Sequence, residues 1–362
     1  MDMEEAARDS GLANATFGTT LNIELLCPVN TDFTQWFLPS CYLVVSLLGL
    51  WGNGLGLWNL CLSSRKSSWS AFSVLVCNLG VADLLYVITL PFLVSYYLQG
   101  RVWLFGPGWC RLTRVLFHLN LYSSIGFLTC ISVHRYLGIV HPLRMLGRCQ
   151  TLGPSLCLSA LVWGWVIIQL SPDFIFSKMD HTGVRCHDTT EHENVGTYLQ
   201  YTLAITMTGF VIPFLIITGC YCHVVVVLQR NRNVDPTLKR RSIKLAVLVM
   251  VLFSVCFLPY HIFRNLNLVS RGWQLQGSCT QASRSIYIAY QVTRGLASLN
   301  SALNPLLYLL ANEELAMRLR TISQRVRQSL RTLWQSQAQQ NVDPNKFIIV
   351  LNEEREEVSD DL

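Results

Sequence analysis

The chain has 362 residues, of which 51% are hydrophobic and 14% are charged, and its formal net charge is +6. Soluble globular proteins carry about 25% charged residues, and the mean hydropathy of +0.35 is too high for that class. The composition therefore excludes a soluble globular protein and indicates a membrane protein.

Seven apolar stretches are long enough to cross a bilayer, because a helix needs about 20 apolar residues to span the hydrocarbon core. They lie near residues 37–62, 71–97, 111–136, 153–172, 198–228, 243–268 and 286–310. The expected fold class is an all-α membrane protein. Residues 37–311 are expected to form a seven-transmembrane helix bundle, and residues 312–334 a short amphipathic eighth helix.

The segments that flank the spans predict an orientation. Residues 1–36 begin with the acidic stretch MDMEEAARDS, which lacks the apolar region of a signal peptide. Basic residues concentrate after the first, third, fifth and seventh spans, which predicts that these segments face the cytoplasm. We therefore expect a multi-pass plasma-membrane protein with an extracellular N-terminus and a cytoplasmic C-terminus. Asn14, in the sequon NAT, is an expected glycosylation site on the outer side.

Four of the thirteen cysteines fall at or beyond the predicted outer ends of the spans, where an oxidising compartment favours disulfides. They are Cys27, Cys110, Cys186 and Cys279. Four cysteines allow three pairings, and their positions alone leave the pairing open.

Each span carries a different polar or proline-containing motif. In chain order the motifs are LWGNGLGLWNL, CNLGVADLLYVITLPF, SVHRYLGIVHP, a tryptophan at 163, a proline at 213, FSVCFLPYH and NPLLY. As an ordered set they resemble the motifs of the rhodopsin-like G-protein-coupled receptors, and the resemblance covers roughly residues 37–325.

Asp83 lies in the middle of the second span. A carboxylate that faces lipid there costs about 2.5–3.5 kcal/mol, so we expect its side chain to face the bundle interior. The resemblance implies a polar network that holds water and a sodium ion, and a purely structural hydrogen-bond network is the alternative. The other expected members are Asn53, Asn120, Ser124, Asn300, Ser301 and Asn304.

At the inner ends of the helices the resemblance implies a switch that opens toward a heterotrimeric G protein. His134 replaces the acid that the family usually has before Arg135, so the common local Asp–Arg pair cannot form. Snorkelling of Arg135 to lipid headgroups is the alternative. The expected switch residues are Arg135, Tyr136, Tyr221, Asn304, Pro305 and Tyr308.

Three arginines lie in the outer half of the bundle, where the positive-inside rule predicts few cations. They are Arg114, Arg264 and Arg294. Three guanidiniums in a low-dielectric cavity repel one another unless an anion bridges them, and their donor geometry suits phosphate. The arrangement therefore predicts a polyphosphate ligand. Asp188, in the second outer loop, is expected to pair with one arginine when the site is empty.

The segments SVHRYLGIVHPLR, CHDTT, FLPYHIFRNLNL and YQVTRGLASLNSALNPLLY resemble the purinergic nucleotide receptors, in particular the adenine-nucleotide subgroup that acts through the Gq class of G protein. This resemblance implies a non-enzymatic receptor for extracellular nucleotides, with ADP or ATP expected, that signals through phospholipase C and calcium release. It also implies the disulfides Cys27–Cys279 and Cys110–Cys186. The implied ligand site comprises Arg114, His118, Tyr122, His261, Arg264, Gln291 and Arg294, and Asp188, Tyr96 and Tyr290 are further candidates.

Two other classes of function compete with this interpretation. Related receptors with the same cation pattern bind dicarboxylates or lipid phosphates. A membrane transporter also places charges in mid-membrane, but the chain shows no repeated half and no matching pair of broken helices. We expect no metal centre, no cofactor besides the sodium ion and no nucleic-acid partner.

The C-terminal region adds cytoplasmic partners to the expectation. Residues 312–334 space apolar residues at three and four with arginines between them, which is typical of an amphipathic helix on the inner leaflet, in contact with membrane lipids. Binding of calmodulin by this helix is an alternative. Residues 335–362 are expected to be a disordered tail, and its terminal SDDL favours a PDZ partner. Arrestin is the remaining expected partner.

Overall fold

The computed structural model describes residues 32–64, 69–141, 152–176, 178–179, 183–190, 194–230, 236–278 and 280–307, with short pieces between 324 and 332. The chain divides into two compact units, residues 1–311 and 312–362, and the following description concerns the first. Asn14, Cys27, Cys279 and Tyr308 lie outside the described residues, as do the tail 335–362 and most of the expected eighth helix 312–334.

The regular secondary structure in the described part of the first unit is helical, apart from one isolated backbone bridge between Met179 and Cys186. Its long helices are α2 (Asp32–Ser64), α3 (Ala71–Val87), α4 (Leu90–Leu98), α5 (Gly106–Val140), α7 (Leu152–Leu170), α8 (Val195–Thr206), α9 (Ile212–Arg230), α10 (Pro236–Leu252), α11 (Leu258–Leu275) and α12 (Gln281–Leu303). Three short turns join or extend them: η1 (Ser171–Phe174), η2 (Met207–Val211) and η3 (Phe253–Phe257).

Six of the resulting rods are long and apolar enough to span a membrane, judged by length and composition. These are α2, α3–α4, α5, α7 with η1, α8–η2–α9 and α10–η3–α11. The seventh expected span corresponds to α12, which is 23 residues long but is not among the six. Its sequence explains this, because Gln291, Arg294 and Asn300 are polar and point into the protein, where each side chain is buried.

Proline residues explain two irregular turns inside long rods. A proline lacks the amide hydrogen of a helix and its ring crowds the carbonyl four residues earlier. The carbonyl that the Pro213 ring would crowd belongs to Gly209, which lies inside the π-helical turn η2. The carbonyl that the Pro259 ring would crowd belongs to Val255, inside the π-helical turn η3. Each π-helical turn is wider than an α-helical turn, so the proline ring fits and the helix continues beyond it.

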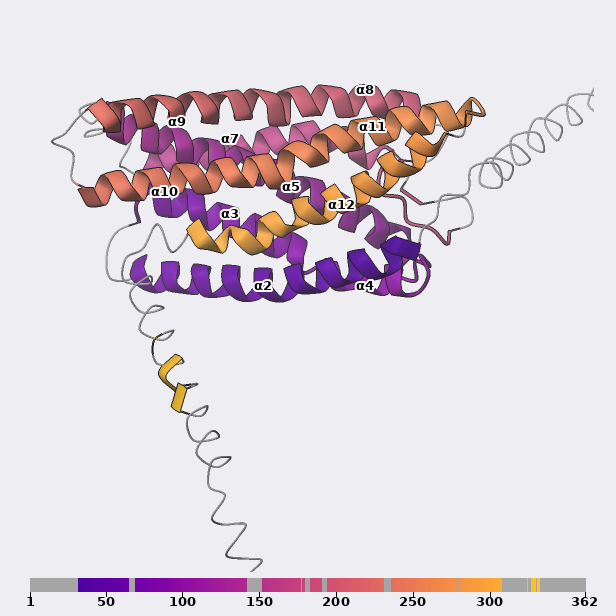
Figure 1. The fold of residues 1–362 in the computed structure, drawn as a ribbon, viewed down its shortest axis with the longest axis horizontal. Helices are drawn as coiled ribbons and strands as arrows, with labels where there is room; N and C mark the ends of the chain where they lie inside the picture. Colours follow the sequence, from indigo (N-terminus) through magenta and orange to yellow (C-terminus); the bar gives the residue numbers. More distant parts are fainter. Residues whose placement is uncertain are drawn as a thin grey trace, which may run out of the picture. The chain divides into compact units, whose positions relative to one another are not determined.

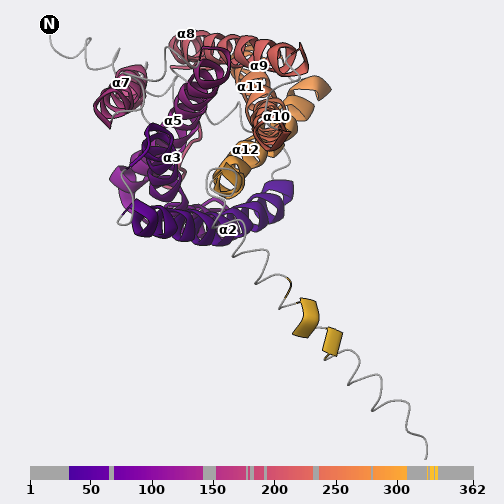
Figure 2. The same cartoon turned by 90° about the vertical axis from the view of Figure 1, so that its left-hand side faces the viewer.

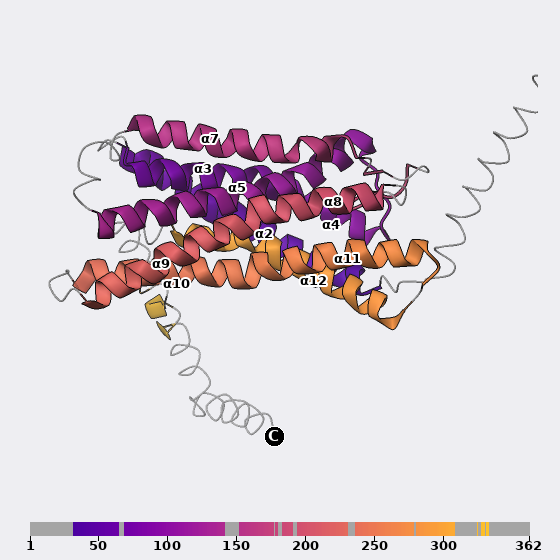
Figure 3. The same cartoon turned by 90° about the horizontal axis from the view of Figure 1, so that it is seen from above.

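The rods form a bundle in which α2 and α12 lie side by side (Figures 1 and 2). Helix α2 packs against α3, α4 and α12, and α12 packs against α11. Helix α5 packs against α3, α7 and α9, and Figure 3 shows α7 at one margin of the bundle. The buried side chains of α5, α11 and α12 therefore face a common interior.

The contact between α2 and the segment after α12 is close. A Cβ atom on Gly52 would lie 2.6 Å from Cγ of Pro305, so only glycine fits this approach without displacing the proline ring. Pro305, an expected switch residue, is thus held against α2.

Candidate functional site

A disulfide and a short backbone pairing hold the loop that contains Cys186 over one end of the bundle, called here the disulfide end. Cys110 in α5 is bonded to Cys186 in the loop, with an S–S length of 2.00 Å. The His187 amide donates to the Lys178 carbonyl at 2.6 Å. These links place Asp188, two residues after the disulfide, beside α5 and α12.

Asp188 bridges two of the three predicted arginines. Its Oδ1 lies 2.8 Å from Nη1 of Arg114, and its Oδ2 contacts Nη1 of Arg294. Gln291 donates to Oδ2 at 3.2 Å and Tyr97 donates to Oδ1 at 3.3 Å. Burial alone would raise the pKa of Asp188, but the two guanidiniums outweigh it and hold the pKa well below its usual range. The carboxylate is therefore ionised at neutral pH.

Other donors of these two arginines are also engaged, although Nε of Arg114 has no hydrogen-bond partner among the described residues. Arg114 donates from Nη2 to the Cys186 carbonyl at 3.0 Å. Arg294 donates from Nε to the Tyr42 hydroxyl at 2.9 Å and from Nη2 to the Tyr97 hydroxyl. Both arginines are buried, with 4% and 2% of their surface exposed. The expectation of a pairing between Asp188 and one arginine was thus too narrow, because this carboxylate serves two.

Arg264 in α11 has a different environment. Its Nη1 donates to the Tyr122 hydroxyl at 3.0 Å and its Nη2 donates to the Tyr198 hydroxyl at 3.2 Å. The side chain is fully buried, and its Nε has no hydrogen-bond partner within the described ranges. Among the described residues, Arg264 forms no ion pair. A buried cation in contact only with neutral hydroxyls is short of a counterion.

A second acid in the same region was overlooked in the sequence. Asp173 in η1 lies 2.8 Å from Nδ1 of His118 and 2.6 Å from Nζ of Lys178. The Tyr198 hydroxyl donates to Asp173 at 3.0 Å. Lys178 also donates to the Thr189 carbonyl, and burial lowers its pKa to about 8 although Asp173 opposes that shift. We call Asp173, His118, Lys178 and Tyr198 the Asp173 cluster.

The two groups together hold more positive than negative charge. Arg114, Arg294 and Lys178 contact the carboxylates of Asp188 and Asp173, whereas Arg264 donates to the hydroxyls of Tyr122 and Tyr198. Two positive charges therefore lack a carboxylate of their own among the described residues of this buried region. Bringing unpaired charges out of water is costly, so the arrangement favours a bound anion.

Predicted aromatic and histidine residues line the same region. The Tyr96 ring centroid lies 5.8 Å from the Arg114 guanidinium, and Tyr290 lies 6.2 Å from Tyr260. His261 stacks on Phe210 at 4.4 Å, and its ring nitrogens have no hydrogen-bond partner among the described residues. All ten predicted ligand-site residues thus lie at this end of the bundle, on α4, α5, α11, α12 and the loop that carries Asp188.

The expected polar network surrounds Asp83. Its carboxylate accepts hydrogen bonds from Asn120 at 2.7 Å and from Asn304 at 2.9 Å. Ser301 donates to the side-chain oxygen of Asn120 at 3.0 Å, and Asn53 donates to the Ser301 carbonyl at 2.8 Å.

Two further members of this network are buried without a partner. The Ser124 hydroxyl and both polar atoms of the Asn300 side chain have no hydrogen-bond partner in the described part of the chain. Their oxygens are of the type that binds hard cations.

Two of the expected switch residues, Arg135 and Tyr136, lie at the opposite end of α5 from the disulfide. The Arg135 guanidinium lies 4.5 Å from the Phe72 ring centroid and makes no ion pair within the described ranges. Tyr221 accepts a hydrogen bond from Ser132 at 2.9 Å, and the Tyr136 hydroxyl lies 3.3 Å from Nδ1 of His223. The described part of the chain holds no cluster of three or more histidine, cysteine or acidic residues that could bind a metal ion.

Comparison with known proteins identifies the class of this molecule. Residues 52–308 match the family described as 7 transmembrane receptor (rhodopsin family). The chain is therefore a multi-pass membrane receptor of that family and not an enzyme.

The relatives narrow the class. The chain is 39% identical to the P2-Y purinoceptor 1 of Homo sapiens over 324 residues, which cover 87% of this chain and 85% of that protein. It is 42% identical to the P2-Y purinoceptor 1 of Gallus gallus over 296 residues, or 80% of each chain. It is 41% identical to the P2-Y purinoceptor 4 of Xenopus laevis over 84% of this chain and 57% of that protein. The chain belongs to the P2-Y purinoceptors.

Proposed function

We propose that this receptor binds extracellular nucleotides, with ADP or ATP as the expected ligands, and signals through the Gq class of G protein, phospholipase C and calcium release. One observation carries the proposal: three buried arginines converge at the disulfide end, and only two of them meet a carboxylate among the described residues. The names of the relatives, which are purinoceptors, support a nucleotide as the anion.

In this proposal the disulfide end faces the extracellular side, so that a soluble nucleotide reaches the arginines. The Asp188 carboxylate stands where a phosphate group would bind, because it accepts from Arg114 and Arg294 together. Phosphate has more acceptor oxygens than a carboxylate and matches guanidinium donors in pairs. A diphosphate or triphosphate displaces Asp188 and also supplies Arg264 with the anion that it lacks.

Binding is transmitted along the rod that contains Arg264. The nucleotide draws α5, α11 and α12 together at the disulfide end, and α10 moves about the wide turn η3 below Pro259. The basic end of α10, Lys239 to Lys244, then separates from Arg135 and admits the G protein. Converting a mostly inactive population into a mostly active one requires about 5.5 kcal/mol of preference for the active state, which several charge-assisted hydrogen bonds can supply.

A sodium ion beside Asp83 is part of the same proposal, supported by the unpartnered oxygens of Ser124 and Asn300 within the described ranges. Arrestin, membrane lipids at the eighth helix and a PDZ protein at the C-terminus remain predicted partners.

The test is a calcium-release assay in cells that express the chain, run over nucleotides, dicarboxylates and lipid phosphates. Arg294→Ala should abolish the nucleotide response at unchanged surface expression, and Arg294→Lys should retain only a weakened response because paired donors are lost. Arg284→Ala is the matched control, since Arg284 is an exposed arginine of the same helix. An unchanged dose response of Arg294→Ala, or a wild-type response only to dicarboxylates or lipid phosphates, refutes the nucleotide site.

A further inference from the structure

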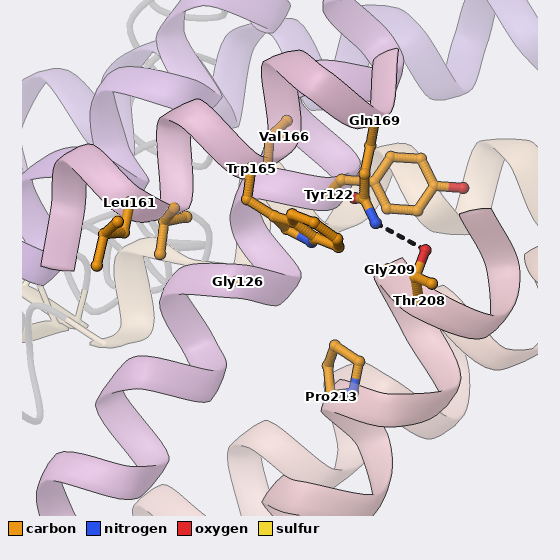
Figure 4. Close-up of a pocket in the computed structure, with 10 residues that line it drawn as sticks. Tyr122, Gly126, Leu161, Trp165, Val166, Gln169, Thr208, Gly209 and Pro213 are labelled. Carbon is orange, nitrogen blue, oxygen red and sulfur yellow. Dashed lines mark hydrogen bonds between the residues drawn. The ribbon is translucent and has the colours of Figure 1, made fainter. Parts of the chain in front are cut away.

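A pocket of about 210 Å³ lies between α5, α7, η2 and α9, apart from the arginine site (Figure 4). The side chains of Leu161 and Trp165 on its α7 wall are 64% and 52% exposed. These residues belong to a membrane-spanning rod, so the solvent at this face of the bundle is lipid. An occupant therefore enters from the bilayer.

Two features of the sequence bring the walls of this pocket close together. Gly209 lies in the wide turn η2, and a Cβ there would lie 2.7 Å from Cδ1 of Tyr122, so the tyrosine ring lies directly against the backbone. Gly126 is the second feature: on α5, a Cβ would lie 2.9 Å from Cγ1 of Val162 on α7. The two glycines therefore let Tyr122 and Val162 pack closely, and the rings of Tyr122 and Trp165 line the pocket beside them.

The chemistry of the lining selects a neutral ligand. None of the residues that line the pocket is charged. A carboxylate or phosphate headgroup would therefore be buried without a cation, which is strongly unfavourable. Gln169 and Thr208 form one small polar group in the lining: Nε2 of Gln169 donates to the Thr208 hydroxyl at 2.8 Å, as the dashed line in Figure 4 shows.

The position of Gln169 and Thr208 at one end of the pocket indicates how a ligand is oriented and how long its apolar part is. Gln169 lies near the disulfide end of α7, and Leu161 lies eight residues closer to the middle of the helix, about 12 Å away along the axis. A molecule with one hydroxyl at the level of Gln169 and a rigid apolar body toward Leu161 fits this layout. Flat rings at Trp165 and Tyr122 suit a fused ring system better than a flexible acyl chain, because a rigid body loses less conformational entropy on binding.

We propose that the pocket between α7, α5 and η2 binds a sterol from the membrane, with its hydroxyl on Gln169 and Thr208 and its rings against Trp165 and Tyr122. This site is separate from the nucleotide site, because the Tyr122 ring lies between the pocket and Arg264, which holds the Tyr122 hydroxyl at 3.0 Å.

The experiment uses the full chain in phosphatidylcholine nanodiscs that contain a photoactivatable cholesterol carrying a diazirine. After irradiation, peptide mapping should locate the label on α7 and η2. Leu161→Trp fills the pocket and should remove this label. Ile168→Trp, a matched change on α7 at a lipid-exposed residue that does not line the pocket, should leave it in place.

Gln169→Leu tests the hydroxyl contact. It should reduce the label about fivefold, the loss expected from one hydrogen bond of about 1 kcal/mol. Excess unlabelled cholesterol should compete, and a fatty acid should not. Label that is spread over all lipid-facing helices, that survives Leu161→Trp, or that is displaced equally by a fatty acid overturns the proposal.

Discussion

Replacing Asp188 with asparagine removes a charge from a buried group without changing its shape. The Asp188 side chain is only 11% exposed and contacts two buried guanidiniums. Removing one partner of a buried ion pair costs about 3–5 kcal/mol. At roughly 2–4 °C per kcal/mol for a domain of this size, the melting temperature of the empty receptor should fall by about 6–20 °C.

The measurement is thermal unfolding of the purified receptor in detergent, with and without nucleotide. The nucleotide's phosphates replace the lost carboxylate, so saturating ADP or ATP should raise the melting temperature of Asp188→Asn more than that of the wild type. Asp32→Asn is the control, since Asp32 is an exposed carboxylate at the start of α2. A melting temperature of Asp188→Asn within about 1 °C of the wild type would show that Asp188 does not neutralise the arginines.

Tyr198, Asp188 and Asn304 each offer a further test. Tyr198→Phe removes the hydroxyl that joins Arg264 to the Asp173 cluster and should cost about 1–3 kcal/mol of stability, read from the melting temperature; no change would mean that Arg264 does not depend on it. The pKa of Asp188 in the folded receptor lies below its unfolded value of about 3.9. The carboxylate therefore contributes its full stabilisation of the folded state above about pH 3.9 and loses it only as the pH falls further. The difference in melting temperature between wild type and Asp188→Asn should thus stay constant from about pH 8 to about pH 5, and a shrinking difference contradicts the assignment. Asn304→Asp puts a second carboxylate beside Asp83, because the Asn304 amide lies 2.9 Å from it, and should increase the stabilisation of the receptor by sodium over potassium; equal stabilisation by both ions argues against sodium there.

The helical framework follows from the sequence because long apolar runs have few alternatives in a bilayer. Six rods are long and apolar enough to be recognised as membrane spans. Helix α12 is less apolar, because it contains the buried polar residues Gln291 and Arg294, and it is recognised by its motif instead. The wide turns η2 and η3 are also traceable, because each contains the carbonyl that a following proline crowds.

Part of the site was out of reach of sequence reasoning. Asp173 and His118 are 55 residues apart, and Lys178 comes from a loop where a lysine normally faces water. Only the fold brings the three together at 2.6–2.8 Å. One signal was available: Asp173 lies at the end of an apolar span, where an acid is expensive unless it has a partner. The sequence could therefore have indicated that Asp173 needs a partner, but not which residues provide it.

The carboxylate that joins Arg114 to Arg294 gives the receptor a built-in competitor. Because Asp188 is held near α5 by the neighbouring disulfide, it competes as a tethered group whose effective concentration is independent of dilution. Each 1.4 kcal/mol by which this internal contact favours the empty form weakens the apparent affinity for a ligand about tenfold. The strength of one loop contact would thus set the agonist concentration at which the receptor responds.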